Sequence, residues 1–319
     1  MVDNLKPQGD RIAKLLARAG IASRREVERM IADRRVALNG VALETPATIL
    51  TSLRGVTVDG KPVAAAERTR LFRFHKPAGL ITAERDPAGR PTIYDALRNA
   101  LPAGSPRVMP IGRLDFSTEG LLLLTNDGGF KRELELPATG VPRTYRARTF
   151  GAVSQAQLED LMDGIEIEGV RYAPINANLE RRTGRNQWIE LTLTEGKNRE
   201  VRRVLEHLGL EVSRLIRTAY GPFVLGDLPK GAAVEERKED LERFHSSLKG
   251  GYSERGTRPS RPPAASPKAT EAASKRGPPQ AKRPRPAPGA GAKPGRRDAA
   301  GSAEGRRQPS SPSRRGPKK

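Results

Sequence analysis

The first candidate for chemistry is Asp115, which stands in the segment GRLDFSTEGLLLLTNDG at residues 112–128. An Asp ahead of a polar stretch is most often a turn or helix-cap residue. Here, however, an apolar strand is predicted over 121–124, soon after the loop. Because reactive side chains are often carried on loops that a rigid scaffold fixes, this setting makes Asp115 a candidate reactive carboxylate.

Other kinds of reactive site find little support in the sequence. His75, His207 and His245 are far apart and lack the spacing of metal ligands. The chain has no cysteine, which excludes disulfides, thiolate metal sites and cysteine nucleophiles. No Gly-Lys-Ser or Gly-Lys-Thr follows Gly112 or Gly120, so no phosphate-binding loop is predicted. We therefore expect no metal site.

The region from Leu71 onward must position Asp115, and strands dominate its pattern. Strands are predicted over 71–74, 143–150 and 188–193, where apolar residues alternate between turn residues. Helices are predicted over 154–162 and 199–208, and Val201, Val204 and Leu205 share one face of the second. Because strands and helices interleave without a regular βαβ period, we expect an α+β domain on a largely antiparallel sheet.

A smaller unit precedes this region. Helices are predicted over 11–19 and after Ser23, whose spacing to Glu26 is that of a capping box. The Asn39-Gly40 pair predicts a hairpin turn between strands at 36–38 and 41–43. Cationic side chains occupy the outer positions, namely Lys14, Arg18, Arg24, Arg25, Arg29, Arg34 and Arg35. On charge alone, a solvated helix face explains them as well as a nucleic-acid interface does.

Charge is distributed unevenly along the 319 residues. The chain has 58 Lys and Arg against 37 Asp and Glu, and residues 246–319 hold 19 of the basic but 4 of the acidic residues. They also hold 13 of the 27 prolines and one aromatic, so they cannot bury enough apolar surface to offset the entropy of ordering them. We predict a disordered basic tail over 246–319.

Length and pattern together predict two folded domains, at 10–66 and 68–245. No apolar run approaches the ~20 residues that span a bilayer, and the start lacks a signal-peptide core. We expect a cytoplasmic protein that does not enter membranes. The net charge of +21 favours nucleic acid as the partner over acidic lipid or acidic protein.

The string RIAKLLARAGIASRREVERMIADRRVALNG, residues 11–40, resembles the αL-type RNA-binding module named after ribosomal protein S4. The resemblance covers residues 10 to about 60. It implies a module whose helices lay Lys14, Arg18, Arg24 and Arg25 on folded RNA. Such contacts to phosphate supply affinity and register without reading the base sequence.

The segment around Asp115 is similar to the catalytic motif of the RsuA/RluB branch of the RNA pseudouridine synthases. Segments 74–80, 143–145, 195–203 and 214–217 with 221–222 resemble further motifs of that family. Arg143 departs from the pattern, which often has Lys there. The Asn198-Arg199 pair is like that of members acting on large-subunit ribosomal RNA.

Carried over by position, the resemblance implies that Asp115 is the nucleophile that frees uracil from its ribose, so that the base rejoins through carbon 5 without a cofactor. Tyr145 is implied to lie against the base and Arg202 to pair with the catalytic carboxylate, although Arg199 and Arg203 are close enough for the alignment to shift. Further substrate contacts are expected from Arg113, Leu215, Asn198 and Arg199. A nearby guanidinium would keep a buried carboxylate ionised, which suits this chemistry.

We therefore expect a monomeric enzyme that isomerises one uridine of ribosomal RNA, or of a ribosome precursor, with a large-subunit target favoured over a small-subunit one. The alternative is a noncatalytic RNA-binding ribosome-assembly factor. A binder needs no buried carboxylate beside its RNA, so Asp115, Tyr145 and Arg202 together argue against it. A uracil methyltransferase is disfavoured because the chain lacks the cysteine thiolate that usually attacks the base.

Overall fold

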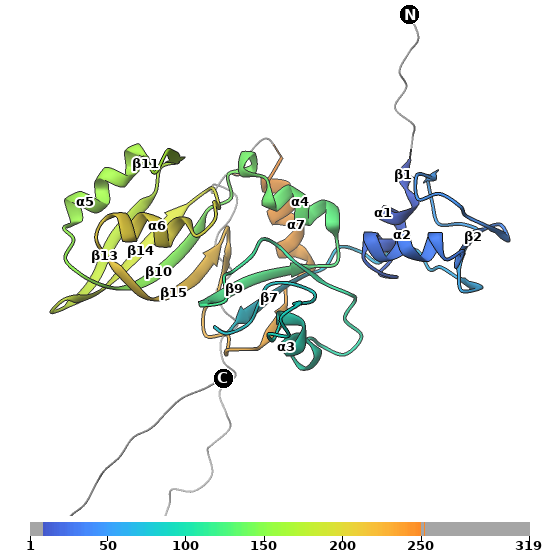
Figure 1. The fold of residues 1–319 in the computed structure, drawn as a ribbon, viewed down its shortest axis with the longest axis horizontal. Coiled ribbons are helices and arrows are strands. Elements are labelled where there is room, and N and C mark those ends of the chain that lie inside the picture. Colours follow the sequence, from blue (N-terminus) through green and yellow to red (C-terminus); the bar gives the residue numbers. More distant parts are fainter. Residues whose placement is uncertain (1–8, 250–251, 253–319) are drawn as a thin grey trace, which may run out of the picture. The chain divides into compact units, whose positions relative to one another are not determined.

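The computed structural model describes residues 9–249 and residue 252. Its N-terminal part holds two helices and two small sheets (Figure 1). The bounds are β1 Asp10–Arg11, α1 Ile12–Arg18, α2 Arg24–Ala32, β2 Val36–Leu38, β3 Val41–Ala42, β4 Ile49–Leu50, β5 Val56–Val58 and β6 Lys61–Pro62. One sheet has the order β3-β2-β5-β6, and β1 pairs with β4. The helices and the larger sheet share one apolar core around Ile12, Leu16 and Val27.

Local sequence explains the turns of this part. The Ser23 hydroxyl begins α2 by accepting a hydrogen bond from the amide of Glu26 at 3.2 Å. The hairpin of β2 and β3 turns at Asn39 and Gly40, whose φ angles of 51° and 83° are the left-handed values that the turn requires. The predicted helices and hairpin are therefore confirmed.

The larger part is built on one sheet of nine strands (Figure 1). Its main path runs β13-β14-β10-β15-β9-β7-β17, with β16 beside β15 and β8 beside β9. The bounds are β7 Leu71–Lys76, β8 Met109–Pro110, β9 Thr118–Thr125, β10 Arg143–Phe150, β13 Asn176–Thr183, β14 Asn186–Leu193, β15 Glu211–Tyr220, β16 Phe223–Val224 and β17 Ala233–Glu235. The pair β9–β15 is parallel and the other pairs of this sheet are antiparallel, as predicted.

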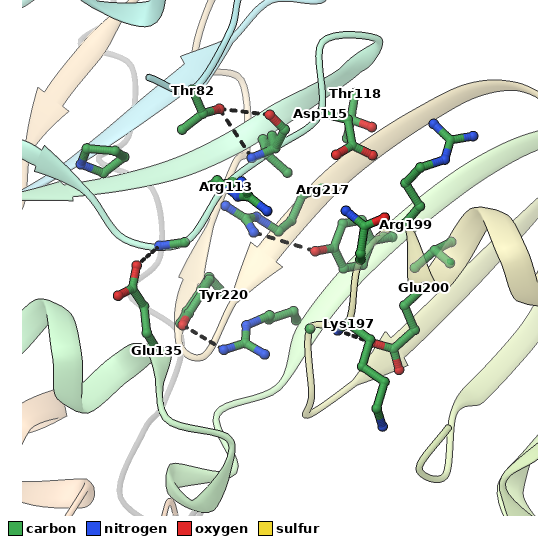
Figure 2. Close-up of a pocket in the computed structure, with 18 of the residues that line it drawn as sticks. Thr82, Arg113, Asp115, Thr118, Glu135, Lys197, Arg199, Glu200, Arg217 and Tyr220 are labelled. Atoms are coloured by element: carbon green, nitrogen blue, oxygen red, sulfur yellow. Dashed lines mark hydrogen bonds between the residues drawn. The ribbon is translucent and has the colours of Figure 1, made fainter. Parts of the chain in front are cut away.

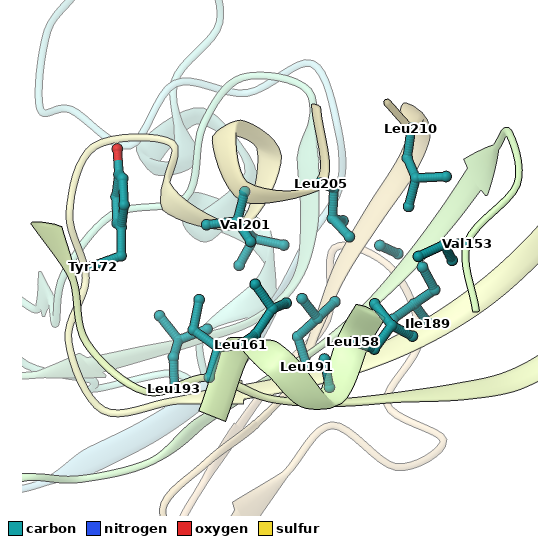
Figure 3. Close-up of a cluster of buried hydrophobic side chains, with 14 of the residues drawn as sticks. Val153, Leu158, Leu161, Tyr172, Ile189, Leu191, Leu193, Val201, Leu205 and Leu210 are labelled. Carbon is teal, nitrogen blue, oxygen red and sulfur yellow. The ribbon is translucent and has the colours of Figure 1, made fainter. Parts of the chain in front are cut away.

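Helices and a small hairpin pack against this sheet. Their bounds are α3 Ile93–Ala100, α4 Gly128–Glu135, α5 Gln155–Glu159, α6 Glu200–His207 and α7 Lys238–Ser247, with the hairpin of β11 Ile165–Ile167 and β12 Val170–Tyr172. The helices α5 and α6 cover one face of the half-sheet β13-β14-β10-β15, where Leu158, Ile189 and Leu205 are fully buried (Figure 3). This core fixes the orientation of every side chain on the opposite face, because side chains alternate along a strand.

Gly120 marks a close approach between β9 and β15. Its φ is 108°, and a Cβ atom added there would lie 2.3 Å from the carbonyl oxygen of Arg217. Glycine is therefore required at this position, because any side chain would force the two strands apart. The contact holds β15 beside the loop that carries Asp115.

The structure departs from the predicted elements in several places. The helix predicted over 154–162 ends at Glu159 and continues as a 3₁₀ turn, Asp160–Asp163. Asp127 begins α4, a helix that the sequence pattern does not predict, and its carboxylate accepts a hydrogen bond from the amide of Gly129 at 2.8 Å. The sequence pattern predicts neither α3, α4 nor α7.

The predicted boundaries fall near changes in the structure. Residues 63–70, which contain the predicted boundary between the domains at 10–66 and 68–245, have no regular secondary structure. The helix α7 continues past residue 245 to Ser247, and Leu248 is buried. Of the predicted tail, residues 250–251 and 253–319 lie outside the described residues. No helix in the described ranges is long and apolar enough to cross a membrane.

Candidate active site

A cavity of about 700 Å³ lies where β9, β10, β15 and α6 come together (Figure 2). Seven residues predicted for the site line it, namely Asp115, Tyr145, Arg202, Arg113, Leu215, Asn198 and Arg199. Small-molecule sites usually enclose ~300 to 1,000 Å³, so the cavity is large enough for a nucleotide.

The loop that carries Asp115 is held from behind by two side chains. Lys76 is fully buried, and its ammonium donates hydrogen bonds to the carbonyl oxygens of Asp115 at 3.0 Å and Thr118 at 2.9 Å. The Thr82 hydroxyl donates to the carbonyl of Leu114 at 2.8 Å (Figure 2). The backbone on both sides of the half-buried Asp115 is therefore fixed.

Lys76 also places a cation beside Asp115. Burial lowers the pKa of Lys76 to about 8, although the negative fields of Asp115 and Glu119 oppose this shift. The ammonium has three donors and uses them on three carbonyls, the third being that of Pro77 at 3.2 Å. Lys76 thus positions the loop and contributes positive charge to it.

Tyr145 lines the cavity from β10, and Arg217 lies beside it on β15. Arg217 is 2 % exposed, and its Nε donates to the carbonyl of Leu121 at 2.7 Å. Its Nη1 lies 3.5 Å from the Tyr145 hydroxyl (Figure 2). Arg217 Nη2 and Thr118 Oγ1 are buried and have no hydrogen-bond partner among the described residues. Unpaired buried polar atoms are costly, so these two groups are suited to binding a ligand.

Arg202 extends from α6 into the same cavity and is 7 % exposed. It donates to the Ser117 hydroxyl and to the carbonyl of Val212, each at 3.2 Å. Within the described ranges, no ion pair shorter than 4.0 Å joins it to Asp115, so the expected direct pairing is not present. Burial lowers the pKa of Arg202, and the field of Asp115 opposes that effect. The two groups are therefore within electrostatic reach, with the guanidinium directed at Ser117 in the same loop.

Two carboxylates hold the loop that precedes α6. Glu195 accepts the amide of Ala173 at 2.7 Å and the ammonium of Lys197 at 2.5 Å. Glu200 accepts the amide of Lys197 at 2.8 Å (Figure 2). These bonds present Asn198 and Arg199 at the cavity, and Arg199 takes a left-handed φ of 51° there.

Glu200 is a carboxyl group in an unusual environment. It is 3 % exposed, and its Oε1 has no hydrogen-bond partner within the described part of the chain. Burial raises the pKa of Glu200 to about 7, and the negative field of Glu195 adds to this shift. The first turn of α6, the helix that carries Arg202, therefore contains a buried carboxyl group, Glu200, whose pKa is near neutral pH.

Arg143 links β10 to this loop. It donates to the carbonyls of Thr194 at 3.1 Å and Glu195 at 2.8 Å, and to the Tyr220 hydroxyl at 3.1 Å. A guanidinium spans such separated acceptors better than an ammonium does. Leu215 is 4 % exposed at the cavity, whereas Arg113 is exposed.

The four predicted cations of the N-terminal part differ in their surroundings. Lys14 is exposed and pairs with Asp10 at 2.6 Å. Arg18 is partly buried and contacts the Asp127 carboxylate at 3.2 Å, so its guanidinium is already engaged. Arg24 and Arg25 are exposed, which leaves them the better candidates for phosphate contacts.

Sequence reasoning assigned no role to Lys76, Glu200 or Arg217. A signal existed for Lys76, because a cation at the end of an apolar strand must find partners when the strand is buried. No local signal separates Arg217 or Glu200 from their charged neighbours. No group of His, Cys, Asp and Glu within residues 9–249 is arranged to hold a metal ion.

Two family models match the chain. Residues 70–207 match the model of RNA pseudouridylate synthase, and residues 10–53 match the S4 domain. These ranges correspond to the nine-stranded part and the N-terminal part.

Individual relatives cover most of the described residues. A protein of Rickettsia bellii, described as an uncharacterized RNA pseudouridine synthase, is 44% identical over 229 residues, covering 72% of this chain and 97% of that protein. The ribosomal large subunit pseudouridine synthase B of Escherichia coli is 40% identical over 232 residues, covering 71% of this chain and 79% of that protein. The crystal structure of a pseudouridylate synthase aligns with a TM-score of 0.50 and 25% identity, covering 73% of this chain and 98% of that one.

Proposed function

This chain belongs to the RNA pseudouridine synthase family, and on that premise we propose that it isomerises one uridine of ribosomal RNA, with Asp115 as the nucleophile. The observation that carries the proposal is the place of Asp115 at a cavity of about 700 Å³, on a loop fixed by Lys76 and facing Tyr145 and Arg202. This arrangement puts a carboxylate within reach of a base and surrounds it with positive charge.

The reaction needs no group beyond the chain and its RNA. Asp115 promotes cleavage of the bond between ribose carbon 1 and uracil nitrogen 1, and the freed base turns within the cavity. Carbon 5 then bonds to carbon 1, carbon 5 loses its proton, and nitrogen 1 ends with one, so the composition of the nucleotide is unchanged. Lys76 and Arg202 contribute positive charge around Asp115.

The cavity also offers groups that hold the base. A uridine in a stem must leave its stack at a cost of a few kcal/mol, and stacking on an aromatic ring returns ~1 to 3 kcal/mol. Tyr145 provides that ring on one side, and Leu215 provides apolar contact. Arg217 Nη2 and Thr118 Oγ1, which have no protein partner in the described chain, are donors suited to the uracil carbonyls.

The target is proposed from the relatives and from the S4 domain. The similar protein of Escherichia coli is named for the large ribosomal subunit, which favours large-subunit RNA as the substrate of this chain. The S4 domain would supply phosphate contacts through Arg24 and Arg25 that fix the register of the RNA. The noncatalytic assembly factor remains the rival function, and a small-subunit target remains the rival substrate.

Pseudouridine mapping tests the proposal directly. Purified protein is incubated separately with large-subunit and small-subunit ribosomal RNA transcripts and with ribosome precursors, and pseudouridines are located by carbodiimide modification. We expect one new site in large-subunit RNA. Asp115→Asn should bind that RNA as the wild type does and lower the rate by at least ~10³-fold, because an amide is a feeble nucleophile.

The exposed Asp163 supplies the control, since Asp163→Asn makes the same chemical change away from the cavity and should keep full activity. Absence of product from the wild type on every RNA would favour the noncatalytic factor. Product confined to small-subunit RNA would reassign the target. Equal loss of binding and turnover in Asp115→Asn would show that this residue acts structurally.

A further inference from the structure

The half-sheet β13-β14-β10-β15 has a second face, on the side away from α5 and α6. This face carries a row of charged and aromatic side chains. The strand register places Arg181 of β13 opposite Trp188 of β14, Trp188 opposite Arg148 of β10, and Arg148 opposite Arg214 of β15. Adjacent strands are about 4.8 Å apart, so the row extends about 14 Å across the sheet. We call these four residues the outer row.

The outer row lies on the face away from the catalytic cavity. Its strand neighbours Ala147 and Ile189 are buried in the core under α5 and α6. Leu215, next to Arg214 on β15, lines the cavity. Because successive side chains of a strand point to opposite faces, the outer row points the other way. Figure 1 shows α5 and α6 together on the other side of these strands.

The fold itself gives no reason for this concentration of positive charge. Arg148 and Arg214 are direct cross-strand partners, and like charges in that position destabilise a sheet. Arg214 is compensated by an ion pair with the buried Glu119. Arg148 and Arg181 are exposed, and neither has an ion pair within 4.0 Å among the described residues. Two uncompensated guanidinium groups therefore face solvent in one row.

Aromatic rings accompany these arginines. The guanidinium of Arg146 lies 5.1 Å from the centre of the Trp188 ring, and that of Arg185 lies 4.5 Å from the Phe150 ring. Phe150 is 40% exposed although it lies on a strand. Rings of this kind stack on bases, and guanidinium groups bind phosphates. An acidic protein surface would be matched by the arginines but gives no reason for the exposed Phe150 ring or for the half-buried Trp188 ring on the same face.

We propose that the outer row binds a second segment of the substrate RNA, on the side of the sheet opposite the catalytic cavity. Arg148 and Arg181 contact phosphates, and Trp188 and Phe150 contact bases or sugars. This inference rests on the proposed function, because it assumes that the nucleic acid is the RNA whose uridine enters the cavity. The two faces of one sheet can be reached together only by an RNA that extends well beyond the modified stem.

The test compares two pairs of substitutions in the full chain. Arg148→Gln with Arg181→Gln removes two charges from the outer row. Arg98→Gln with Arg243→Gln removes two exposed charges from α3 and α7 and is the matched control. Each protein is titrated with a long transcript of the modified ribosomal RNA region and with one trimmed to the modified stem-loop, over a series of salt concentrations. Thermal melting verifies that all variants are folded.

For single-stranded RNA, each phosphate contact contributes about 0.7 of a decade of affinity at 0.1 M salt through counterion release, so the loss of two contacts should raise Kd of the outer-row variant for the long RNA about 10- to 50-fold. The slope of log Kd against log salt should also fall by about 1.4. Affinity for the trimmed RNA, and the rate of pseudouridine formation at saturating protein, should match those of the wild type. The control should change none of these quantities by as much.

Equal affinity of the outer-row variant and the control for the long RNA would overturn the inference and point to an acidic protein as the partner of this face. Equal losses on long and trimmed RNA would also overturn it, because the row would then act on RNA at the cavity. Failure of the proposed function is recognised separately. It would appear as an absence of pseudouridine from the wild type, whatever the two transcripts show about binding.

Discussion

Arginines of the strands β10, β13 and β15 lie on both faces of the sheet, and the two sets are buried to very different extents. Towards the cavity, Arg143 and Arg217 are 8 % and 2 % exposed and donate to backbone carbonyls. On the outer face, Arg148 and Arg181 are exposed and without ion pairs in the described ranges. The same residue type therefore has two different uses in one sheet.

The difference follows from the cost of removing charge from water. A buried guanidinium must be satisfied by fixed acceptors, and those acceptors hold it in one position. An exposed guanidinium keeps its water, moves freely and acts through a field that salt screens. We therefore expect substitutions on the cavity side to change rate and stability, and substitutions of exposed arginines to change salt-dependent affinity.

The largest effect is expected at Arg202, a buried arginine that reaches the cavity from α6. Arg202→Gln should lower the single-turnover rate by at least ~100-fold, because a charge close to Asp115, the proposed nucleophile, is lost. It should also reduce the free energy of unfolding by about 1 to 3 kcal/mol, through the loss of hydrogen bonds to Ser117 and Val212. Rate assays on the mapped substrate and urea unfolding measure both quantities.

The exposed neighbour Arg203, on the same helix, supplies the control for that prediction. Arg203→Gln should leave both rate and stability close to those of the wild type. A larger rate loss in Arg203→Gln or Arg199→Gln than in Arg202→Gln would show that this other arginine, and not Arg202, acts beside Asp115.

The next largest effect is expected on the pH dependence of stability, through Glu200 at the start of α6. The pKa of Glu200 is raised above its ordinary value to about 7, so the protonated form stabilises the fold. The stabilisation from the protonated Glu200 is fully present below pH 4.5, the ordinary pKa of Glu in the unfolded chain. It is lost as the pH rises through 7, the pKa of Glu200 in the folded protein. It amounts to up to about 3 kcal/mol. Glu200→Gln, which resembles the protonated acid, should remove this part of the pH dependence of unfolding.

The exposed Glu206 on the same helix provides the comparison, since Glu206→Gln should leave the pH dependence intact. Stability is measured by urea unfolding at a series of pH values from 4.5 to 8. An unchanged slope in Glu200→Gln would show that this carboxyl does not control the start of α6.

A smaller effect is expected at the contact between β9 and β15. Gly120→Ala should lower stability by about 2 kcal/mol and slow catalysis, because the new methyl would meet the carbonyl of Arg217 and the φ is left-handed. Gly128 lies in α4, and a Cβ there would meet the Met109 side chain at an ordinary 3.8 Å. Gly128→Ala should therefore be neutral or stabilising. Thermal melting of both variants decides whether the close approach matters.

The smallest effect should come from the exposed arginines of the S4 domain. Arg24→Gln with Arg25→Gln should weaken RNA binding by about tenfold at 0.1 M salt and reduce the salt dependence of Kd, without changing the melting temperature. Fluorescence anisotropy with the modified RNA measures the affinity. A fall in melting temperature, with unchanged salt dependence, would mean that these side chains act within the fold and break the contrast between exposed and buried arginines.

Prediction from sequence succeeded where local patterns are decisive. Asn39-Gly40 sets a hairpin turn, the apolar run at 121–124 sets a buried strand, and the order of motifs indicates the family. Prediction from sequence missed the short helices α3, α4 and α7, because these helices depend on packing against the sheet more than on their own sequence. Arg202 illustrates the limit at the site, since its side chain reaches Ser117 and not the carboxylate of Asp115.

The amino-acid sequence by itself determined the two folded units, the choice of Asp115 as the candidate carboxylate and the sign of the charge around it, because these follow from residue types and from patterns over a few positions. Tertiary structure alone decided which charged groups are buried. Lys76, Glu200 and Arg217 are polar in the sequence like many others, and they acquire distinct properties because distant strands and loops exclude water around them. The same packing separated the arginines of one sheet into a cavity set and an exposed set.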